Sequence, residues 1–360
     1  MTIDGFMRAA IWANPGEYTD SISVTLTSLP IPKPSPTQIL IKVKAASLCH
    51  TDTMVPSGIF ETDFPIIAGH ESVGEVLHMG EGARKEGWKV GERVGALLNS
   101  GGCGNCGECR YHSKRYCPEA SMLGLKGENG VFAEYTLVDK DWTVKIPDGL
   151  SYEQAAPLTC AGVTIYSAIQ KLNLAPGQLL LISGLGGLGS LGVQIAKAKG
   201  LTVIGSDVNQ SAHDYLLTLA QKFKPDLLLN PRYDKVQDLS LEIGALRNEG
   251  YGSFDGVDAA IICTDSPSAI PYAISLLRPH SKLLLTAGPM DMHLSLLEFV
   301  FKDITVAGTL NGTRDQLKET MELCAKEGIK SNIFIERWDE GKGVERIMSG
   351  HARGKGVVKV

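Results

Sequence analysis

Apolar and polar residues alternate in the first part of the chain, most clearly over residues 38–46. The two faces of this segment differ, with apolar side chains on one and lysines on the other: Ile39, Ile41, Val43 and Ala45 against Lys42 and Lys44. Such alternation predicts a half-buried antiparallel strand. Shorter segments with strand character follow at residues 72–76, 93–97 and 132–138, separated by glycine and charged turns. The first 150 residues therefore predict an all-β domain.

The pattern changes after residues 147–150, where apolar runs begin to alternate with helical stretches. A helical stretch that contains Cys160 comes first, and six predicted strands follow: 179–183, 202–207, 226–230, 257–263, 282–287 and 304–308. The runs 227–229 and 283–285 are apolar on both faces, as parallel strands covered by helices must be. These features indicate an α/β fold with a doubly wound parallel sheet.

Length and composition limit what the chain can be. Its 360 residues favour two domains, which we place at 1–155 together with 313–360, and at 156–312. A helix near 314–327 and a strand at 357–360 are expected to return to the first of these. A hydrophobic content of 43% and a charged content of 21% are typical of a soluble globular protein. A net charge of −5 and only 6% aromatic residues argue against nucleic acid or a membrane surface as a partner.

Two segments bear on targeting and membranes. Residues 1–13 include Asp4 and Arg8 and lack the apolar core of a signal peptide. Residues 172–196 carry no charge, but glycines and Pro176 interrupt them, so a buried strand, a tight loop and a helix are the better interpretation. We therefore expect a cytoplasmic protein, in which clustered cysteines bind metal more often than they form disulfides.

A glycine-rich sequence follows the predicted strand 179–183 with the spacing Gly-x-Gly-x-x-Gly. The next segment predicts a helix that ends at Gly200 and has its buried face at Leu188, Leu191 and Ile195. In this setting the first glycine permits a tight turn, the second lets a pyrophosphate approach the backbone, and the third lets helix and sheet pack closely. The helix N-terminus would then stabilise the phosphate charge. The predicted cofactor contacts are Gly184, Gly186, Gly187, Leu188 and Gly189.

Asp207 ends the next predicted strand, 23 residues after Gly184. A carboxylate there can accept hydrogen bonds from the adenosine ribose hydroxyls and would repel a 2′-phosphate. The sequence therefore predicts NAD, in preference to NADP, as the cofactor. The alternative is a structural glycine turn followed by an incidental aspartate, which the strand–loop–helix context disfavours.

Six of the eight cysteines fall into two groups with the character of metal ligands. The first group has the spacing C-x2-C-x2-C-x7-C on a loop too short to hold a core of its own: Cys103, Cys106, Cys109 and Cys117. Four thiolates close a tetrahedral zinc shell without an open position, so we predict a structural zinc site. Reduced surface cysteines or disulfides are the alternative.

The second group comes from distant parts of the chain and comprises Cys49, His70 and Cys160. Two thiolates and one imidazole neutralise Zn2+ and leave one position for water or substrate, which is typical of catalytic zinc. Glu71 is a candidate for that position when no substrate is bound, and Asp52 for the partner of the His70 ring. Other cysteines and histidines are treated as core, surface or packing residues: Cys263, Cys324, His78, His112 and His213.

In this order, the motifs resemble those of the zinc-dependent alcohol dehydrogenases of the medium-chain dehydrogenase/reductase family, most closely the yeast-type branch. The resemblance covers essentially the whole chain and rests on the four-cysteine loop and on residues 49–52, 69–71, 158–166, 182–191 and 301–304. It implies a GroES-like β domain with two zinc ions, a Rossmann domain that binds NAD, and an active site in the cleft between them. It also implies a homodimer or homotetramer joined through the Rossmann sheets.

The resemblance assigns roles to single residues as well. The second cysteine group would hold the catalytic zinc, Thr51 would hydrogen-bond the substrate oxygen, and His50 would contact the cofactor pyrophosphate. Lys355 stands where the family usually has an arginine with that same contact, and a lysine keeps the charge but loses the bidentate geometry. Met54 stands where the family often has the histidine that ends a proton relay, so proton release must use water or the cofactor ribose.

Together these features predict a zinc-dependent oxidoreductase that transfers hydride between NAD and an alcohol, interconverting it with an aldehyde or ketone. The substrate-side candidates are apolar, which favours an apolar primary or secondary alcohol over a sugar polyol: Met54, Ile59, Phe60 and Leu98. One alternative is an NADPH-dependent reductase of a conjugated double bond or imine, which Asp207 disfavours. Another is a dinucleotide-binding protein without catalysis, which has no need for the second cysteine group.

Overall fold

The computed structural model of the chain describes residues 5–12, 24–246, 256–288, 291, 294, 296–349 and 354–360, with the backbone alone for 237, 238, 240 and 241. The chain forms two compact units. The β unit comprises Met1–Val163, Gly312–Lys326 and Ile333–Val360, and the α/β unit comprises Thr164–Asn311 and Glu327–Asn332. The β unit extends to Val163, eight residues beyond the predicted boundary at 155. The short segment 327–332, which was predicted to belong to the β unit, belongs to the α/β unit. Of the N-terminal segment considered above, residues 1–4 and 13 lie outside the described residues.

A mixed sheet built around one central strand forms the core of the β unit. Its strand order is β11 (Thr143–Lys145), β6 (Arg93–Ala96), β5 (Glu71–Met79), β3 (Gln38–Ser47), β19 (Lys355–Lys359) and β18 (Ile333–Arg337), with β10 (Tyr135–Asp139) also paired to β3. β3 is antiparallel to β5, β10 and β19, as its alternation predicted. Ile39, Ile41 and Val43 are fully buried, whereas Lys42 is exposed. The predicted closing strand is β19, and it returns to this sheet as expected.

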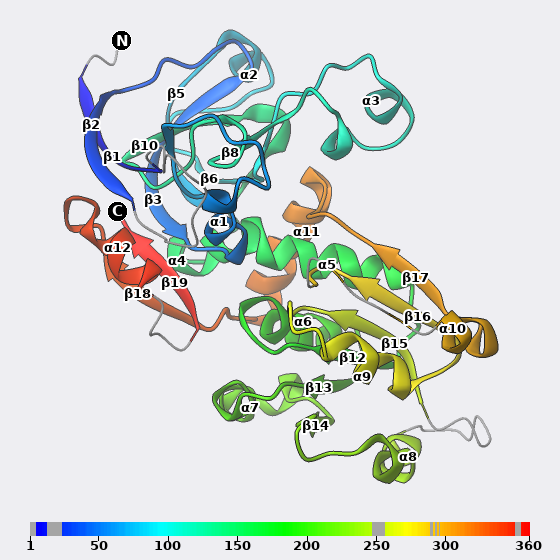
Figure 1. Ribbon diagram of the computed structural model, residues 1–360. Coiled ribbons are helices and arrows are strands. Elements are labelled where there is room, and N and C mark those ends of the chain that lie inside the picture. Colours follow the sequence, from blue (N-terminus) through cyan, green and yellow to red (C-terminus); the bar gives the residue numbers. More distant parts are fainter. Residues whose placement is uncertain are drawn as a thin grey trace. The chain divides into compact units, whose positions relative to one another are not determined.

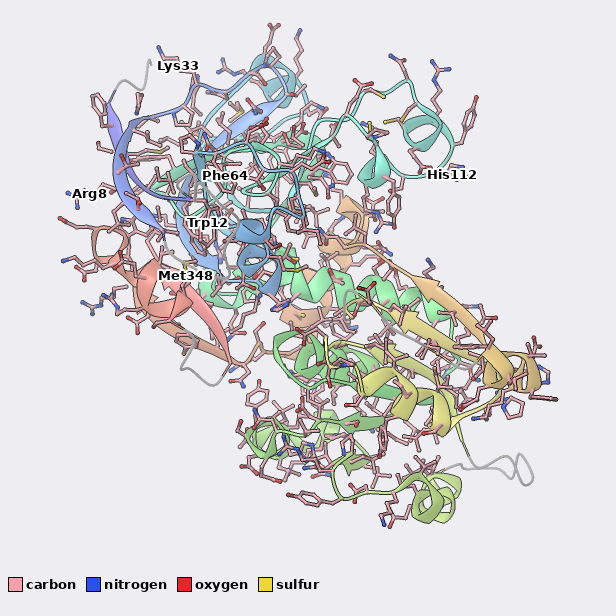
Figure 2. The ribbon with its side chains drawn as sticks, viewed as in Figure 1. Arg8, Trp12, Lys33, Phe64, His112 and Met348 are labelled. Carbon is pink, nitrogen blue, oxygen red and sulfur yellow. The ribbon has the colours of Figure 1, made fainter. Side chains whose placement is uncertain are left out.

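Two small sheets complete the β unit: β2 (Thr25–Pro30), β1 (Phe6–Trp12) and β4 (Ile66–Ile67), and β7 (Asn99–Ser100), β8 (Ser121–Leu123) and β9 (Gly127–Glu128). Trp12 and Phe132 pack in the apolar core, while Arg8 reaches the surface (Figure 2). The helical segments are α1 (His50–Thr53), η1 (Val55–Ser57), α2 (Glu81–Lys85), α3 (Gly107–Tyr111), η2 (Lys114–Tyr116), η3 (Lys140–Trp142), α4 (Tyr152–Ala155), η4 (Ala156–Thr159), α11 (Arg314–Glu327), η6 (Asp339–Gly341) and α12 (Lys342–Met348).

The α/β unit is built on a parallel sheet (Figure 1). In its described part, six strands lie in the order β14 (Leu227–Leu229), β13 (Thr202–Ser206), β12 (Leu179–Ser183), β15 (Val257–Ile262), β16 (Leu277–Leu285) and β17 (Thr305–Gly308). Numbered along the chain, this order is 3-2-1-4-5-6, which confirms the predicted doubly wound sheet. Every residue of β12 and β15 is buried, because helices cover both faces. The helical segments are α5 (Ala161–Leu172), α6 (Gly187–Ala198), α7 (Gln210–Thr218), η5 (Gln221–Phe223), α8 (Val236–Ala245), α9 (Ala269–Leu276) and α10 (Leu296–Lys302).

Several details differ from the predictions. The helical stretch around Cys160 is interrupted at that residue, which separates η4 from α5 and has φ −130° and ψ −70°. Leu188 is only half-buried, and the buried part of α6 runs instead from Gly189 to Ala196. The strand predicted to begin at residue 282 begins at Leu277. The uncharged segment 172–196 forms β12, the glycine loop and most of α6, as predicted. Within the described residues, no helix is long and apolar enough to span a bilayer.

Candidate metal centres and dinucleotide loop

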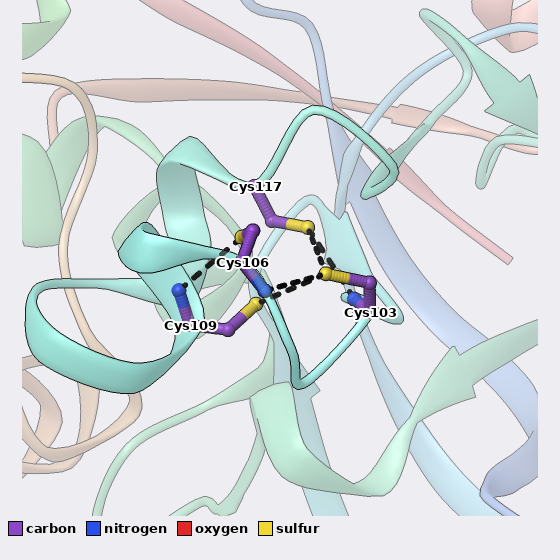
Figure 3. Close-up of side chains that lie close together, drawn as sticks. All are labelled: Cys103, Cys106, Cys109 and Cys117. Atoms are coloured by element: carbon purple, nitrogen blue, oxygen red, sulfur yellow. Dashed lines mark hydrogen bonds between the residues drawn. The ribbon is translucent and has the colours of Figure 1, made fainter.

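The four cysteines of the first group converge on one point in the β unit (Figure 3). Their sulfurs lie within 4.8 Å of one another, and Cys103 Sγ is 3.6 Å from Cys117 Sγ and 3.9 Å from Cys109 Sγ. Backbone amides also point at the sulfurs: Cys106 N donates to Cys103 Sγ at 3.3 Å, and Cys103 N to Cys117 Sγ at 3.3 Å. Such N–H···S contacts stabilise thiolates, so the backbone of this loop is arranged for anionic sulfur.

Without a cation, the surroundings of this group act in opposite directions on two of its thiols. The backbone amide of Cys103 lowers the pKa of Cys117 to about 7, whereas desolvation raises the pKa of Cys109 to about 12. A divalent ion among four sulfurs removes this conflict, because each thiolate then has a positive partner. The donor set therefore fits a tetrahedral Zn2+ with no position left for substrate. His112, for which the sequence predicts a surface or packing role, is exposed on the same loop (Figure 2).

The second group also converges, although its members are far apart in sequence. Ligand atoms of Cys49, His70, Glu71 and Cys160 lie within 4.8 Å of one another. Cys49 precedes α1, His70 and Glu71 lie at the start of β5, and Cys160 occupies the break between η4 and α5. Because these elements pack around the central sheet of the β unit, the sheet fixes the spacing of the group.

Asp52 orients the ring of His70. Asp52 Oδ1 lies 2.7 Å from His70 Nδ1, and its other oxygen accepts a hydrogen bond from Cys49 N at 2.9 Å. Both Asp52 and His70 are fully buried. His70 Nε2 is buried with no hydrogen-bond partner among the described residues. A buried ring nitrogen held in this way fits a metal ligand, since its other nitrogen is already fixed by a carboxylate.

The electrostatics of this group also favour a cation. A hydrogen bond from Cys160 lowers the pKa of Cys49 well below its usual value, and the same contact raises the pKa of Cys160. Burial opposes a charged His70 ring, but Asp52 and Cys49 outweigh it and raise the pKa of His70. The surroundings of the ring therefore favour positive charge at this site. A divalent ion would supply that charge and bind both sulfurs as thiolates.

Glu71 has partners of its own within the β unit. The ammonium of Lys355 lies 2.9 Å from Glu71 Oε1 and donates to the carbonyl of Leu48 at 2.8 Å. The hydroxyl of Ser47 donates to Glu71 Oε2. Burial raises the pKa of Glu71 to about 7, against the opposing charge of Lys355. Lys355 was predicted as a cofactor contact and Glu71 as an occasional ligand, and both roles stay predictions. Ser47 was not singled out.

The other predicted residues of this region surround α1. Thr51 Oγ1 lies 3.6 Å from Cys49 Sγ, and His50 is exposed at the first position of the helix. Of the predicted substrate-side residues, Leu98 is 6% exposed within the core of the β unit, whereas Ile59 is 41% exposed. Phe60 packs partly against the same core. Ile59 can therefore present apolar surface to a ligand within this unit, whereas Leu98 is almost fully covered.

The glycine loop of the α/β unit has the geometry that its spacing predicted. Gly184 has φ +94°, and a Cβ there would lie 2.9 Å from Thr264 Cβ. A Cβ on Gly189 would lie 1.8 Å from Gly184 O, so only glycine lets α6 start this close to the strand. A Cβ on Gly186 would meet no heavy atom within 4 Å, which leaves its backbone open to a ligand. These are the three functions required of a pyrophosphate-binding turn.

Asp207 lies beside this loop at the end of β13. Its Oδ2 accepts a hydrogen bond from Leu185 N at 2.7 Å, and its Oδ1 accepts one from Asn209 N at 2.8 Å. The carboxylate is therefore fixed in orientation next to the start of α6, and its oxygens retain lone pairs for further donors. This position is the one a ribose-binding carboxylate needs.

Comparisons with known proteins agree with these features. Residues 35–148 match the family described as "Alcohol dehydrogenase GroES-like domain", and residues 187–326 match "Zinc-binding dehydrogenase". An alcohol dehydrogenase of Geobacillus stearothermophilus is 33% identical over 327 residues, covering 89% of this chain and 92% of the relative. Alcohol dehydrogenase 2 of Emericella nidulans is 33% identical over 344 residues, covering 92% and 91%.

Solved structures superpose on nearly the whole chain. The alcohol dehydrogenase of Aeropyrum pernix superposes with a TM-score of 0.82 at 26% identity, covering 98% of this chain and 100% of its own. Acetophenone reductase of Geotrichum candidum, solved in complex with NAD, superposes with a TM-score of 0.82 at 25% identity, covering 100% and 99%.

Proposed function

The chain belongs to the medium-chain, zinc-type alcohol dehydrogenase family, and on this premise we propose that it interconverts an apolar alcohol with its aldehyde or ketone, using NAD. The observation that carries the proposal is the convergence of Cys49, His70 and Cys160, in which His70 is fully buried and its Nε2 lacks a hydrogen-bond partner among the described residues. Within the family we place the chain nearest the yeast-type branch, on the motifs at residues 49–52 and 69–71.

We propose two zinc ions per chain. Zinc supplies Lewis-acid polarisation of an oxygen at the Cys49 group and a structural cross-link at the four-cysteine loop. Cys49, His70 and Cys160 hold the first ion, and Asp52 fixes the His70 ring through Nδ1. The four sulfurs of the loop hold the second.

Thr51 is the proposed hydrogen-bond partner of the substrate oxygen. Its Oγ1 lies beside Cys49 Sγ, so a substrate at the open position of the Cys49 group would meet this hydroxyl. Thr51 Oγ1 takes the proton of the alcohol and passes it outward. Met54, which ends α1, cannot carry a proton, so the last transfer uses water or the cofactor ribose. NAD, when bound, would accept the hydride, and His50, Lys355, the glycine loop and Asp207 are the residues proposed to hold it.

An activity assay tests the proposal directly. Purified protein is offered NAD+ with ethanol, hexanol, a secondary alcohol and sorbitol while NADH is monitored by its absorbance. We expect hexanol to give the highest kcat/KM and sorbitol the lowest, because the substrate-side residues are apolar. If no alcohol gave NADH and the protein instead reduced an enal or imine with NADPH, the result would support the reductase alternative.

Replacement of Asp207 by serine is expected to shift cofactor use towards NADP. The substitution removes the negative charge beside the ribose site and with it the repulsion of a 2′-phosphate. We expect the ratio of kcat/KM values for NADP+ and NAD+ to rise about 100-fold, the equivalent of roughly 2.7 kcal/mol. Asp214→Ser, which removes a carboxylate from exposed α7, is the matched control and should leave the ratio unchanged. An unchanged ratio in Asp207→Ser would remove the basis for the proposed NAD preference.

We further propose a homodimer formed through the edge of the parallel sheet. β17 ends the sheet in the described part of the chain, and α10 precedes it (Figure 1). Large apolar side chains of α10 are exposed. These are Leu296 (74%), Leu297 (64%), Val300 (73%) and Phe301 (81%). An open strand edge with an apolar patch is suited to pairing with a second copy about a two-fold axis.

Phe301→Glu is expected to weaken this dimer by at least about 100-fold, because it places a charge in the apolar patch that the dimer would bury. Light scattering coupled to size-exclusion chromatography would show the change from dimer to monomer. Tyr233→Glu alters an equally exposed aromatic residue elsewhere and serves as the control. A Phe301→Glu protein that remains dimeric at low concentration would show that the chain associates through another surface.

A further inference from the structure

Ser47, Glu71 and Lys355 form a buried polar trio on three adjacent strands. Ser47 and Glu71 stand opposite each other in the β3–β5 pairing, and β19, which begins with Lys355, runs along the other edge of β3. Ser47 and Glu71 are fully buried, and Lys355 is 9% exposed. Side chains on paired strands are held more rigidly than side chains on loops. The position of the Glu71 carboxylate is therefore set by the central sheet.

Both oxygens of the Glu71 carboxylate have a partner within this trio. Ser47 Oγ donates a hydrogen bond to Oε2, and the Lys355 ammonium forms an ion pair with Oε1 while also donating to the carbonyl of Leu48. One oxygen of the carboxylate also lies within 4.8 Å of the ligand atoms of Cys49, His70 and Cys160. The trio thus holds the carboxylate beside the metal site, and its two partners restrain any further approach to the ion.

Charge balance favours this tethered arrangement. Two thiolates neutralise a divalent ion, and Glu71 and Lys355 neutralise each other. If Glu71 moved onto the ion, Lys355 would stay buried without its counter-ion and the Ser47 hydroxyl without its acceptor. Leaving buried charged and polar groups unpaired is unfavourable.

We infer that Ser47 is a positioning residue, which together with Lys355 holds Glu71 beside the catalytic metal and away from its open position, so that this position stays available to substrate. The inference rests on the proposed function, since it assumes a metal at Cys49, His70 and Cys160. It also limits the predicted role of Glu71, because movement of this carboxylate onto the ion would weaken its contacts with Ser47 and Lys355.

Ser47→Ala tests the inference. Without the hydroxyl, Glu71 is freer to reach the ion and to compete with substrate. With cobalt(II) in place of zinc at the catalytic site, we expect the visible absorption spectrum of the substrate-free variant to differ from that of the parent protein. In the zinc form we expect KM for hexanol to rise about 10-fold, the size of effect typical of residues that support metal ligands, with kcat little changed.

Ser72→Ala is the matched control. Ser72 is the next residue on β5 and is 1% exposed, and its hydroxyl has no hydrogen-bond partner among the described residues. Its loss should change neither the cobalt spectrum nor KM. In a Glu71→Gln background, Ser47→Ala should have no further effect on the spectrum. A cobalt spectrum of Ser47→Ala identical to that of the parent, or an equal spectral change in the Glu71→Gln background, would overturn the inference.

Measurements on the parent protein distinguish a wrong role for Ser47 from a wrong proposed function. If the parent takes up cobalt and oxidises hexanol while Ser47→Ala behaves like the parent, the role assigned to Ser47 is wrong and the proposed function stands. If the parent neither takes up cobalt at this site nor oxidises any alcohol, the proposed function itself is wrong.

Discussion

Replacement of Cys49 by alanine is expected to lower kcat/KM for alcohol oxidation by at least about a thousandfold. A catalytic metal contributes several kcal/mol to transition-state stabilisation, and each 1.36 kcal/mol corresponds to a factor of ten. The substitution removes one of the three proposed ligands, so that His70 Nε2 and Cys160 can no longer close the site. NADH affinity should change little, because the proposed cofactor loop belongs to the α/β unit. Steady-state kinetics measures kcat/KM, NADH fluorescence titration measures cofactor affinity, and elemental analysis measures the zinc content.

Cys324→Ala provides the control for this experiment. Cys324 is also in the β unit, is 2% exposed on α11, and belongs to neither metal group. Its loss should leave both activity and zinc content unchanged. A Cys49→Ala protein with the activity of the parent would disprove the assignment of the catalytic ligands. Retained zinc with lost activity would place Cys49 in the chemistry but outside the ligand set.

Replacement of Cys106 by alanine is expected to lower the midpoint of thermal unfolding by roughly 10 °C or more. Structural zinc contributes directly to folding, and a loss of several kcal/mol shifts the midpoint of a domain of this size by this amount. The loop has little else to stabilise it, since α3 and η2 contain no buried residues. Calorimetry, with zinc analysis of the same sample, measures the effect.

Chelation of the zinc from the parent protein should reproduce the instability of Cys106→Ala. Glu119→Gln is the control, because it changes an exposed charge close to Cys117 without touching a sulfur. If Cys106→Ala lost its zinc and unfolded at the same temperature as the parent, the loop would be stable without the ion. The structural role proposed for the second zinc would then be wrong.

Parts of the fold follow directly from local sequence. The predicted strand at 179–183 and the predicted helix at 314–327 have the bounds of β12 and α11. β12 is a continuous apolar run bounded by glycine, and α11 has a clear helical period. β16 shows where this reasoning fails. Its first part, with Arg278 and His280, lacks the apolar run that marks the rest, and its register against β15 shifts at Val257 and Ala259.

The metal ligands were predictable because cysteine and histidine in ordered spacings carry a specific chemistry. The surroundings of Glu71 were not, because they depend on which strands pair. Ser47 contacts Glu71 only through the register of β3 against β5, and Lys355 contacts Glu71 only because β19 returns to β3. A serine at the end of the apolar face of β3 was the one local signal for such a partner.

The return of β19 to β3 affects how the protein is made. Residues 45–47 pair with residues 357–359, and the contact from Lys355 to Leu48 spans 307 positions of the chain. During synthesis, residues 45–47 of β3 therefore stay unpaired on one edge while the α/β unit is made, although β10 can already pair with residues 38–42 of the same edge. Unpaired strand edges promote aggregation, so this part of β3 is exposed to wrong pairing until β19 has been made.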